Sequence, residues 1–247
     1  MTAETGQTDL VTSEIENVRE LVAQTRYVLF DFDGPICQLF AGHSAEVIAR
    51  AQVKWLKERG LYAVLTEDER SRPDPHGVLS TVARRHPGSD LVAELEERLT
   101  QEELKAVRNA MPTAYADPLI RTWVAVGARL AIATNNSART VTSYLSGRGL
   151  MPCFAPYIYG RTQDLSLLKP HPATLKRALN AMGASPEASL MIGDTPSDHA
   201  AAARAGVRFL GYARNPAKAR VLLAAGVPQR SIMNSLEPLL HAVRAHS

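Results

Sequence analysis

The chain has 247 residues, of which 45% are hydrophobic and 21% charged, so it can bury a substantial core and is not a disordered or low-complexity chain. Two cysteines, Cys37 and Cys153, exclude a disulfide framework and a cysteine-based metal cluster, and they fit a reducing compartment. No apolar run approaches the roughly 20 residues of a membrane span, and the first residues lack the pattern of a secretory signal. We therefore predict a cytoplasmic protein with no membrane partner.

The net charge of +3 is unevenly distributed. Residues 1–118 carry 13 basic and 20 acidic side chains, whereas residues 119–247 carry 15 basic and 5 acidic ones. A basic half raises the question of nucleic-acid binding. No basic run alternates with aromatic residues, however, so we predict no nucleic-acid partner and interpret the charge as an attraction for anionic substrates.

The first expected element is a helix at residues 13–24, where Ser13 and Glu16 form a possible capping box ahead of an apolar stripe. The segment that follows, YVLFDFDGPI at residues 27–36, has the pattern of a buried strand that ends in two acids and a turn. The helix is expected to pack beside this strand.

Two carboxylates at the end of a buried strand need a physical reason. Side chains at positions i and i+2 of a strand point the same way, so Asp31 and Asp33 can meet one substrate. Neighbouring carboxylates repel each other unless a cation lies between them. A hard divalent ion such as Mg²⁺ takes oxygen ligands and also binds phosphate, so it is the cofactor that this pair favours.

The next part of the chain has helical patterns and no convincing strand between residues 42 and 117. Helices are expected at residues 44–59, near 67, at 77–85 and at 91–110. A block of this length is too long for a loop between two strands, so it indicates an insertion. We therefore predict an α/β core domain made of residues 1–40 and 118–247, and a helical cap domain made of residues 41–117.

From residue 118 onward, helices and strands alternate. Strands are expected at 128–134, 156–160, 189–194 and 207–212, and helices at 118–126, 138–145, 173–182, 197–205, 216–225 and 235–243. This alternation predicts a Rossmann-like parallel sheet with helices on both faces. Sites in such sheets lie beyond the carboxyl ends of the strands, so polar residues at those ends are the candidates for function.

Polar residues follow the strand at 128–134. The Thr134 hydroxyl, the Asn135 amide and the first N–H groups of the next helix would form a cradle for phosphate. The same residue types also cap helices, and Asn136 or Ser137 could serve that purpose alone.

A lysine lies at a restricted place in the chain. Lys169 is followed by Pro170 and Pro172, which favour an extended backbone and fix the direction of the side chain. Its ammonium would hold a nucleophile ionised and offset charge on a phosphoryl group during transfer. The alternative interpretation is a solvated surface lysine.

Two more acids occur in MIGDTPSDHAAAARAG at residues 191–206. If Asp198 begins the next helix, Asp194 and Asp198 can face one metal ion across a single turn. Alternatively, Asp194 or Ser197 caps that helix and Asp198 is a favourable charge near its N-terminus.

Together these segments resemble the four motifs of the haloacid dehalogenase (HAD) superfamily, in the family's order: DFDG, Thr134 at a strand end, KPHPATL, and GDTPSD before AAAARAG. The third segment is most similar to that of phosphoglycolate-phosphatase-like members, which carry a helical cap after the first motif. Pro35 and Asn136 stand where other residues are commoner, but neither change removes a reacting group.

The resemblance implies a role for each acid. Asp31 would attack phosphorus and form an aspartyl-phosphate, and Asp33 would be the general acid and then the base. Lys169 would be the third catalytic residue. Mg²⁺ would be held by Asp31, by the backbone carbonyl of Asp33 and by Asp194, with Asp198 in support.

Substrate contacts are expected from Gly34, Thr134 and Asn135, with Arg161 as a further candidate. The resemblance thus implies a magnesium-dependent phosphatase for a small phosphorylated metabolite. Dehalogenases and phosphonatases of the superfamily lack an acid at the position of Asp33. A phosphomutase, which would depend on a bisphosphate, and a non-catalytic protein that binds a phosphorylated ligand are the alternatives, and both a monomer and a homodimer remain open.

Overall fold

The computed structural model describes residues 18–246. Strand β1 (Tyr27–Phe30) lies inside a six-stranded sheet with the order β5-β4-β1-β6-β7-β8. The other strands are β4 (Arg129–Ser137), β5 (Ile158–Arg161), β6 (Ser189–Gly193), β7 (Arg208–Tyr212) and β8 (Ile232–Met233). Every neighbouring pair in this sheet is parallel, which confirms the predicted α/β fold.

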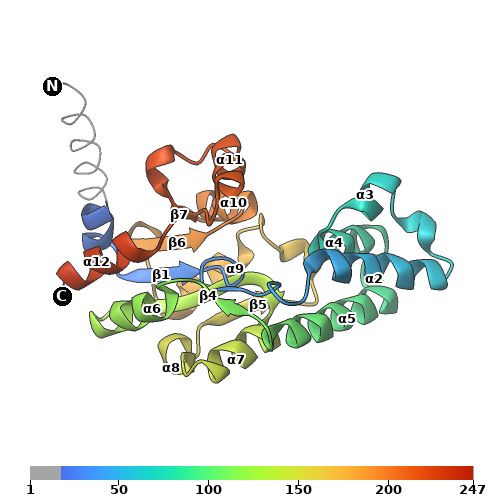
Figure 1. The fold of residues 1–247 in the computed structure, drawn as a ribbon, viewed down its shortest axis with the longest axis horizontal. Helices are drawn as coiled ribbons and strands as arrows, with labels where there is room; N and C mark the ends of the chain where they lie inside the picture. The colour runs from blue at the N-terminus through green and yellow to red at the C-terminus, as the bar shows by residue number, and fades with distance from the viewer. Residues whose placement is uncertain (1–17, 247) are drawn as a thin grey trace.

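Helices cover both faces of the sheet (Figure 1). They are α6 (Ala116–Ala125), α7 (Ala138–Gly147), α8 (Met151–Phe154), α9 (Ala173–Met182), α10 (Pro196–Ala205), α11 (Pro216–Ala224) and α12 (Glu237–Ala245). Val28 and Phe30 pack with α6, α7, α8 and α12, whereas Leu29 packs with α9 and α10 on the other face. Burying an apolar side chain of this size contributes about 1.5–3 kcal/mol, so the alternation along β1 stabilises both layers.

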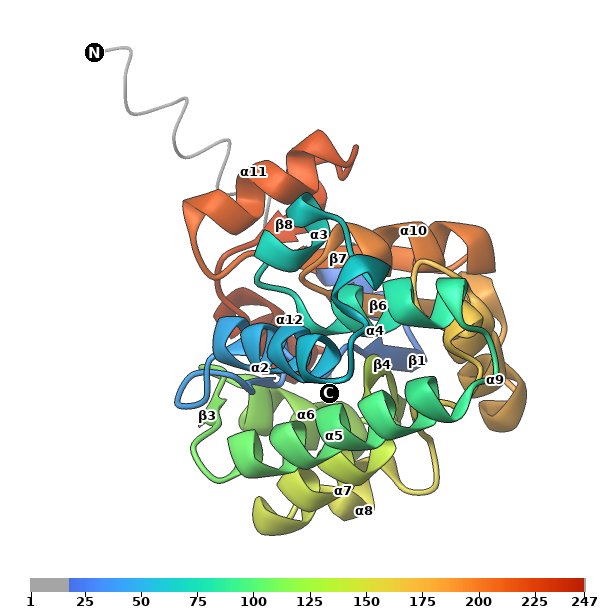
Figure 2. The ribbon, with the colours of Figure 1, turned by 90° about the vertical axis from the view of Figure 1, so that its right-hand side faces the viewer.

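Four helices form a separate group beyond the carboxyl ends of the strands (Figures 1 and 2). They are α2 (Ala45–Glu58), α3 (Glu67–Ser71), α4 (Pro75–Arg85) and α5 (Asp90–Val107). They share an apolar cluster that includes Leu79, Leu95 and Leu99, and Leu165 and Leu168 pack against it from the loop after β5. We propose that this group is the expected cap domain, residues 41–117, placed over the core.

A short ribbon marks where the chain leaves the core and where it returns. Strand β2 (Cys37–Gln38) pairs antiparallel with β3 (Met111–Pro112), so Cys37 lies opposite Pro112. We expected no strand at 111–112, because two residues that include a proline show no alternation. Helix α8 and strand β8 were also not predicted, because elements of four and two residues are too short to show a hydrophobic period.

The remaining expected elements are present with shifted ends. The strand expected to stop at residue 134 continues to Ser137, whose side chain caps α7 by accepting from the N–H of Arg139. Residues 18–23 are helical, in agreement with part of the helix expected at 13–24. The capping box of Ser13 and Glu16 lies outside the described residues.

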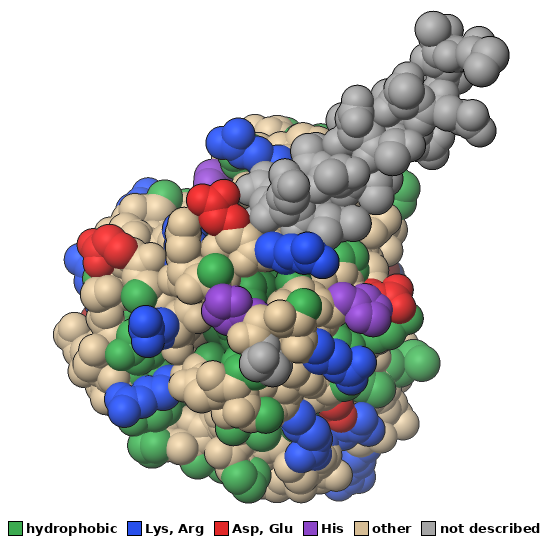
Figure 3. Space-filling view, turned by 90° about the vertical axis from the view of Figure 1, so that its left-hand side faces the viewer, with side chains coloured by type: hydrophobic (Ala, Val, Ile, Leu, Met, Phe, Trp, Pro, Cys, Tyr) green, Lys and Arg blue, Asp and Glu red, His purple; other side chains and the backbone are tan. Residues whose placement is uncertain are grey.

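The surface at the amino ends of the strands carries basic side chains at separate places, with acidic side chains and histidines between them (Figure 3). None of the helices in residues 18–246 combines the length and the apolar character that crossing a membrane would need.

Candidate active site

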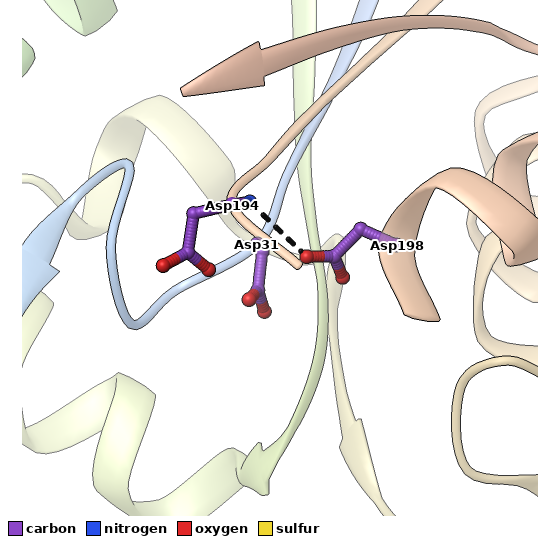
Figure 4. A group of neighbouring side chains, drawn as sticks. All are labelled: Asp31, Asp194 and Asp198. Carbon is purple, nitrogen blue, oxygen red and sulfur yellow. Dashed lines mark hydrogen bonds between the residues drawn. The ribbon is translucent and has the colours of Figure 1, made fainter. Parts of the chain in front are cut away.

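Three carboxylates meet at the carboxyl ends of two neighbouring strands. Asp31 follows β1, Asp194 follows β6, and Asp198 lies in the first turn of α10. One oxygen from each carboxylate lies within 4.8 Å of the others. Figure 4 shows the three side chains side by side. All three residues are buried, and the fold brings the first and fourth segments together here.

Asp198 is held from several sides. Its Oδ2 accepts from the N–H of Asp194 (3.2 Å) and from the N–H (3.0 Å) and hydroxyl (2.7 Å) of Thr195. Its Oδ1 pairs with Nζ of Lys169 at 2.5 Å. Thr195 is the N-cap of α10, and Asp198 completes a capping box with it. The carboxylate of Asp198 therefore fixes both the Asp194 loop and Lys169.

Lys169 is a buried cation and not a solvated surface lysine. Its Nζ lies 2.8 Å from Oδ1 of Asp31, 2.8 Å from the carbonyl of Ala133 and 2.5 Å from Asp198. Burial alone would lower the pKa of Lys169, but the charges of Asp198 and Asp31 outweigh it and raise the pKa. The ammonium therefore stays charged beside Asp31.

The Asn135 amide positions the lysine segment. Its Nδ2 donates to the carbonyl of Lys169 (3.1 Å), and its Oδ1 accepts from the N–H of Lys169 (2.8 Å). We expected this amide to face phosphate, whereas here both of its ends contact the backbone of Lys169. Thr134 is buried at the end of the same strand, and its hydroxyl also contacts Asp31.

Asp33 has a different environment from Asp31. It is half-buried, and its Oδ1 accepts from the N–H of Leu39 at 2.8 Å, on the segment that follows β2. Burial raises the pKa of Asp33 to about 6, with the charge of Asp31 adding to the rise and the Leu39 bond opposing it. Asp33 is thus an acid that can gain or lose a proton near neutral pH.

Gly34 makes the meeting of β1 and β6 possible. Its φ of +114° suits glycine alone, and a Cβ there would lie 2.5 Å from Cγ of Asp194. We expected Gly34 to contact substrate, but its N–H donates to the carbonyl of Cys37 at 2.6 Å and its carbonyl accepts from the hydroxyl of Thr113. Its contribution here is the space that it leaves for Asp194.

Lys218, in the first turn of α11, is a residue that the sequence analysis missed. Its Nζ lies 2.6 Å from Oδ2 of Asp194. Burial raises the pKa of Asp194 to about 7, and Lys218 opposes that rise. The available signal was its place just beyond β7, because that edge of the sheet holds the site.

Arg161 ends β5 and was expected to contact substrate. Its guanidinium is instead buried and donates to Glu96 (2.8 Å), Thr100 (2.8 Å), Glu103 (2.8 and 3.5 Å) and the carbonyl of Asn135 (2.9 Å). A guanidinium has five N–H groups, and these bonds engage all five. Arg161 therefore joins α5 to the core.

The donor set at the site fits a hard divalent cation. Within residues 18–246, four carboxylates, of Asp31, Asp33, Asp194 and Asp198, are close to two ammonium groups, of Lys169 and Lys218. This leaves two negative charges in excess when all the acids are ionised. Burial, with the repulsion of neighbouring acids, raises the pKa values of Asp31, Asp33 and Asp194. Oxygen ligands with an excess of two charges suit an ion of the Mg²⁺ type.

The model of the haloacid dehalogenase-like hydrolase family matches residues 25–206, which is most of the chain. The phosphoglycolate phosphatase of Rhodospirillum rubrum is 31% identical over 206 residues, covering 76% of this chain and 81% of that protein. The phosphoglycolate phosphatase of Colwellia psychrerythraea is 30% identical over 195 residues, covering 74% of this chain and 82% of that protein.

The fold is also similar to that of solved structures. The crystal structure of a predicted phosphatase from Clostridium acetobutylicum matches with a TM-score of 0.64 at 19% identity, over 90% of this chain and 99% of that structure. At this identity the likeness concerns the fold.

Proposed function

Because the chain belongs to the haloacid dehalogenase-like hydrolase family and is a phosphoric monoester hydrolase, we propose that it cleaves a small phosphate monoester with Mg²⁺ through an aspartyl-phosphate on Asp31. The observation that supports this proposal most strongly is the contact of Lys169 with both Asp31 and Asp198, beside Asp194.

In the first step, an oxygen of Asp31 forms a bond to phosphorus, and the ester P–O bond breaks. Asp33 gives its proton to the leaving oxygen, so the alcohol departs neutral. The ammonium of Lys169, 2.8 Å from Asp31, keeps the nucleophile ionised and offsets charge on the phosphoryl oxygens. The hydroxyl of Thr134 is close enough to Asp31 to hold the same phosphoryl group.

In the second step, Asp33 takes a proton from water, and the water oxygen attacks the phosphorus of the aspartyl-phosphate. The acyl P–O bond breaks, orthophosphate leaves and Asp31 is regenerated. A pKa of about 6 suits Asp33 to both roles, because the acid is only partly ionised near that pH.

The metal would be held by Asp31, Asp194 and the backbone carbonyl of Asp33, with Asp198 supporting the loop. Bound there, Mg²⁺ would neutralise phosphoryl oxygens and bring phosphate and nucleophile together. Asp194 and Asp31 already lie close enough to share one ion.

Helices α2–α5 lie over the carboxyl ends of the strands, and we propose that they exclude water during attack and select the leaving group. The relatives named phosphoglycolate phosphatase, of which this chain covers 81% and 82%, make 2-phosphoglycolate the first ester to test.

Phosphate release from a panel of monoesters, with Mg²⁺ and with EDTA, tests the proposal. Release that needs both the metal and Asp31 is the expected result. Release that persists in Asp31→Asn would contradict it. Conversion of a sugar phosphate to its isomer that needs a bisphosphate, without phosphate release, would indicate a phosphomutase, and binding without turnover would indicate a non-catalytic protein.

A further inference from the structure

The most extensive polar contact between α5 and the core involves one acid that the motifs do not contain. Glu103 lies on α5, and its side chain has no exposed surface. Burial alone would raise the pKa of Glu103, but the hydrogen bond from His76 and the charge of Arg161 outweigh it and lower the pKa to about 2. Glu103 is therefore a buried, ionised carboxylate, and such a group is tolerated only with close partners.

Its partners on the core side surround the start of α7. Oε2 of Glu103 accepts from the N–H of Ser137 (2.9 Å) and the hydroxyl of Thr140 (3.1 Å). Oε1 accepts from Arg161 (2.8 Å) and from Nδ2 of Asn136 (3.2 Å). The carboxylate thus satisfies the N–H of Ser137, which is both the last residue of β4 and the N-cap of α7, and lies near the positive end of that helix.

Through Asn136, this contact reaches the proposed phosphate cradle. The Thr134 hydroxyl lies 3.1 Å from Oδ1 of Asn136, and the N–H of Asn136 donates to the same hydroxyl oxygen at 3.2 Å. Both residues are buried. A side chain locked by a second layer of hydrogen bonds keeps the geometry that a reacting group needs.

On the cap side, Glu103 holds His76 of α4. Nε2 of His76 lies 3.1 Å from Oε1 of Glu103. An ionised carboxylate accepts only, so Nε2 carries the hydrogen of this bond and Nδ1 does not take part in it. The imidazole is partly exposed and lies near enough to Asp33 to influence the pKa of that acid.

We propose, on the basis of the proposed function, that Glu103 is a positioning residue that fixes the Thr134 hydroxyl through Asn136 and holds His76 where its Nδ1 contacts the leaving group. One carboxylate then aligns the phosphate cradle with the leaving-group side of the site. Glu103 joins α5 to the end of β5 through its buried ion pair with Arg161 and to the end of β4 through hydrogen bonds from Asn136 and Ser137, so the alignment is present before substrate binds.

Glu103→Gln is a poor first test, because it would leave Arg161 buried without its full charge partner. Asn136→Ala removes the contact of Glu103 with the phosphate cradle, and His76→Gln replaces the imidazole on the leaving-group side. Both variants leave the Glu103–Arg161 pair intact. His76→Gln also keeps an N–H near the position of Nε2. The adjacent Glu102 offers a matched control, since among residues 18–246 it bonds His43 (2.6 Å) and Lys105 (2.6 Å), both outside the core strands.

The experiment measures steady-state kinetics with 2-phosphoglycolate and p-nitrophenyl phosphate, inhibition by orthophosphate, and thermal unfolding. We expect Asn136→Ala to lower kcat/KM for both esters by about 3- to 10-fold and to weaken orthophosphate inhibition to a similar extent, the range for one lost hydrogen bond. We expect His76→Gln to leave orthophosphate inhibition unchanged and to change KM by different factors for the two esters. Glu102→Gln and His43→Gln should match the wild type.

Two outcomes overturn the positioning role. One is an active wild type whose Asn136→Ala and His76→Gln variants behave like the Glu102→Gln control. The other is a loss of activity that only follows a loss of thermal stability, with orthophosphate inhibition unaltered in Asn136→Ala. A wild type without phosphate release that depends on Asp31 would instead remove the proposed function, and the positioning role with it.

Discussion

Asp31 and Asp33 are two residues apart, yet their surroundings separate their roles. Asp31 faces the ammonium of Lys169 at 2.8 Å, whereas Asp33 accepts from the backbone N–H of Leu39. A neighbouring cation favours a carboxylate that stays ionised and attacks. Burial with a weaker partner favours one that exchanges a proton near neutral pH.

Replacing the proposed nucleophile tests the first of these roles. Asp31→Asn keeps the shape of the side chain but removes the attacking oxygen, so we expect kcat to fall by about 10⁴-fold or more. The acid-labile phosphoenzyme should disappear from quenched samples with labelled ester. Asp90→Asn, at an exposed position on α5, is the matched control. Near-normal turnover in Asp31→Asn would mean that another group attacks.

The proton exchanged by Asp33 gives the two half-reactions opposite pH dependences. Formation of the phosphoenzyme needs protonated Asp33, so its rate should fall as pH rises through about 6. Hydrolysis of the phosphoenzyme needs ionised Asp33, so its rate should fall as pH drops through the same value. Rapid-quench kinetics at several pH values measures both rates.

Asp33→Asn should slow both half-reactions by about 10²- to 10⁴-fold and remove both dependences. If the variant keeps the pH dependence of either half-reaction, a different residue carries the proton in that half-reaction.

At the scale of elements, the turn after β1 depends on a residue without a side chain. Gly34→Ala would place a methyl group 2.5 Å from Cγ of Asp194, at a φ that alanine rarely adopts. A displaced Asp194 should raise the Mg²⁺ concentration needed for half-maximal activity and lower kcat by about 10²-fold. Gly60→Ala is the control, because Gly60 also has a positive φ but has no neighbour within 4 Å of the added carbon. Equal effects of the two substitutions would show that backbone strain alone is responsible.

Elements with a clear period could be predicted from the sequence. The strands of the sheet and helices such as α2 and α9 show the alternation or the apolar stripe of their type. β2 and β3 have two residues each and carry no period, so they are defined only by their mutual contact. β4 continues past Thr134 because Ser137 pairs with Arg161 of β5 after a register shift, and that pairing depends on residues far away in the sequence.

The residues of the site also divide into those that the sequence predicts and those that depend on long-range packing. Asp31, Lys169, Asp194 and Asp198 occur in recognisable segments, and the fold brings them together as expected. The partners of Arg161 and Asn135 depend on long-range packing, so their substrate contacts could not be judged from the sequence. Glu103 was missed because a glutamate on an amphipathic helix usually faces solvent.

At the scale of the whole molecule, the acids of the site make the stability of the metal-free protein depend on pH. The pKa values of Asp33 and Asp194 are raised by burial to about 6 and about 7, from 3.8. The folded protein then binds more protons than the unfolded chain, so stability should fall as pH rises from about 4 to about 7. Each unit of raised pKa costs about 1.4 kcal/mol once the group is ionised. The pKa of Glu103, lowered from 4.5 to about 2, opposes this trend only below about pH 5, because above that pH Glu103 is ionised in the folded and the unfolded chain alike.

Bound Mg²⁺ should restore the stability lost at higher pH, because its positive charge offsets the repulsion between the ionised acids. We expect the rise in melting temperature caused by Mg²⁺ to be larger at about pH 7.5 than at about pH 5.5. Thermal unfolding in Mg²⁺ and in EDTA at both pH values measures it, and Asp194→Asn should lose most of the difference. An effect of Mg²⁺ that is equal at both pH values would contradict the proposed link between metal and acids.

The pairing of β2 with β3 has a consequence for exchange of protein modules. Cys37 and Pro112 lie opposite each other, so the two connections between the core and the intervening helices lie side by side. A helical domain from another protein, if its two ends are close together, could replace these helices without changing the strand order of the sheet. Such a chimera would also need an acid where Glu103 meets Arg161, because the recipient core would otherwise keep a buried arginine without its counter-ion.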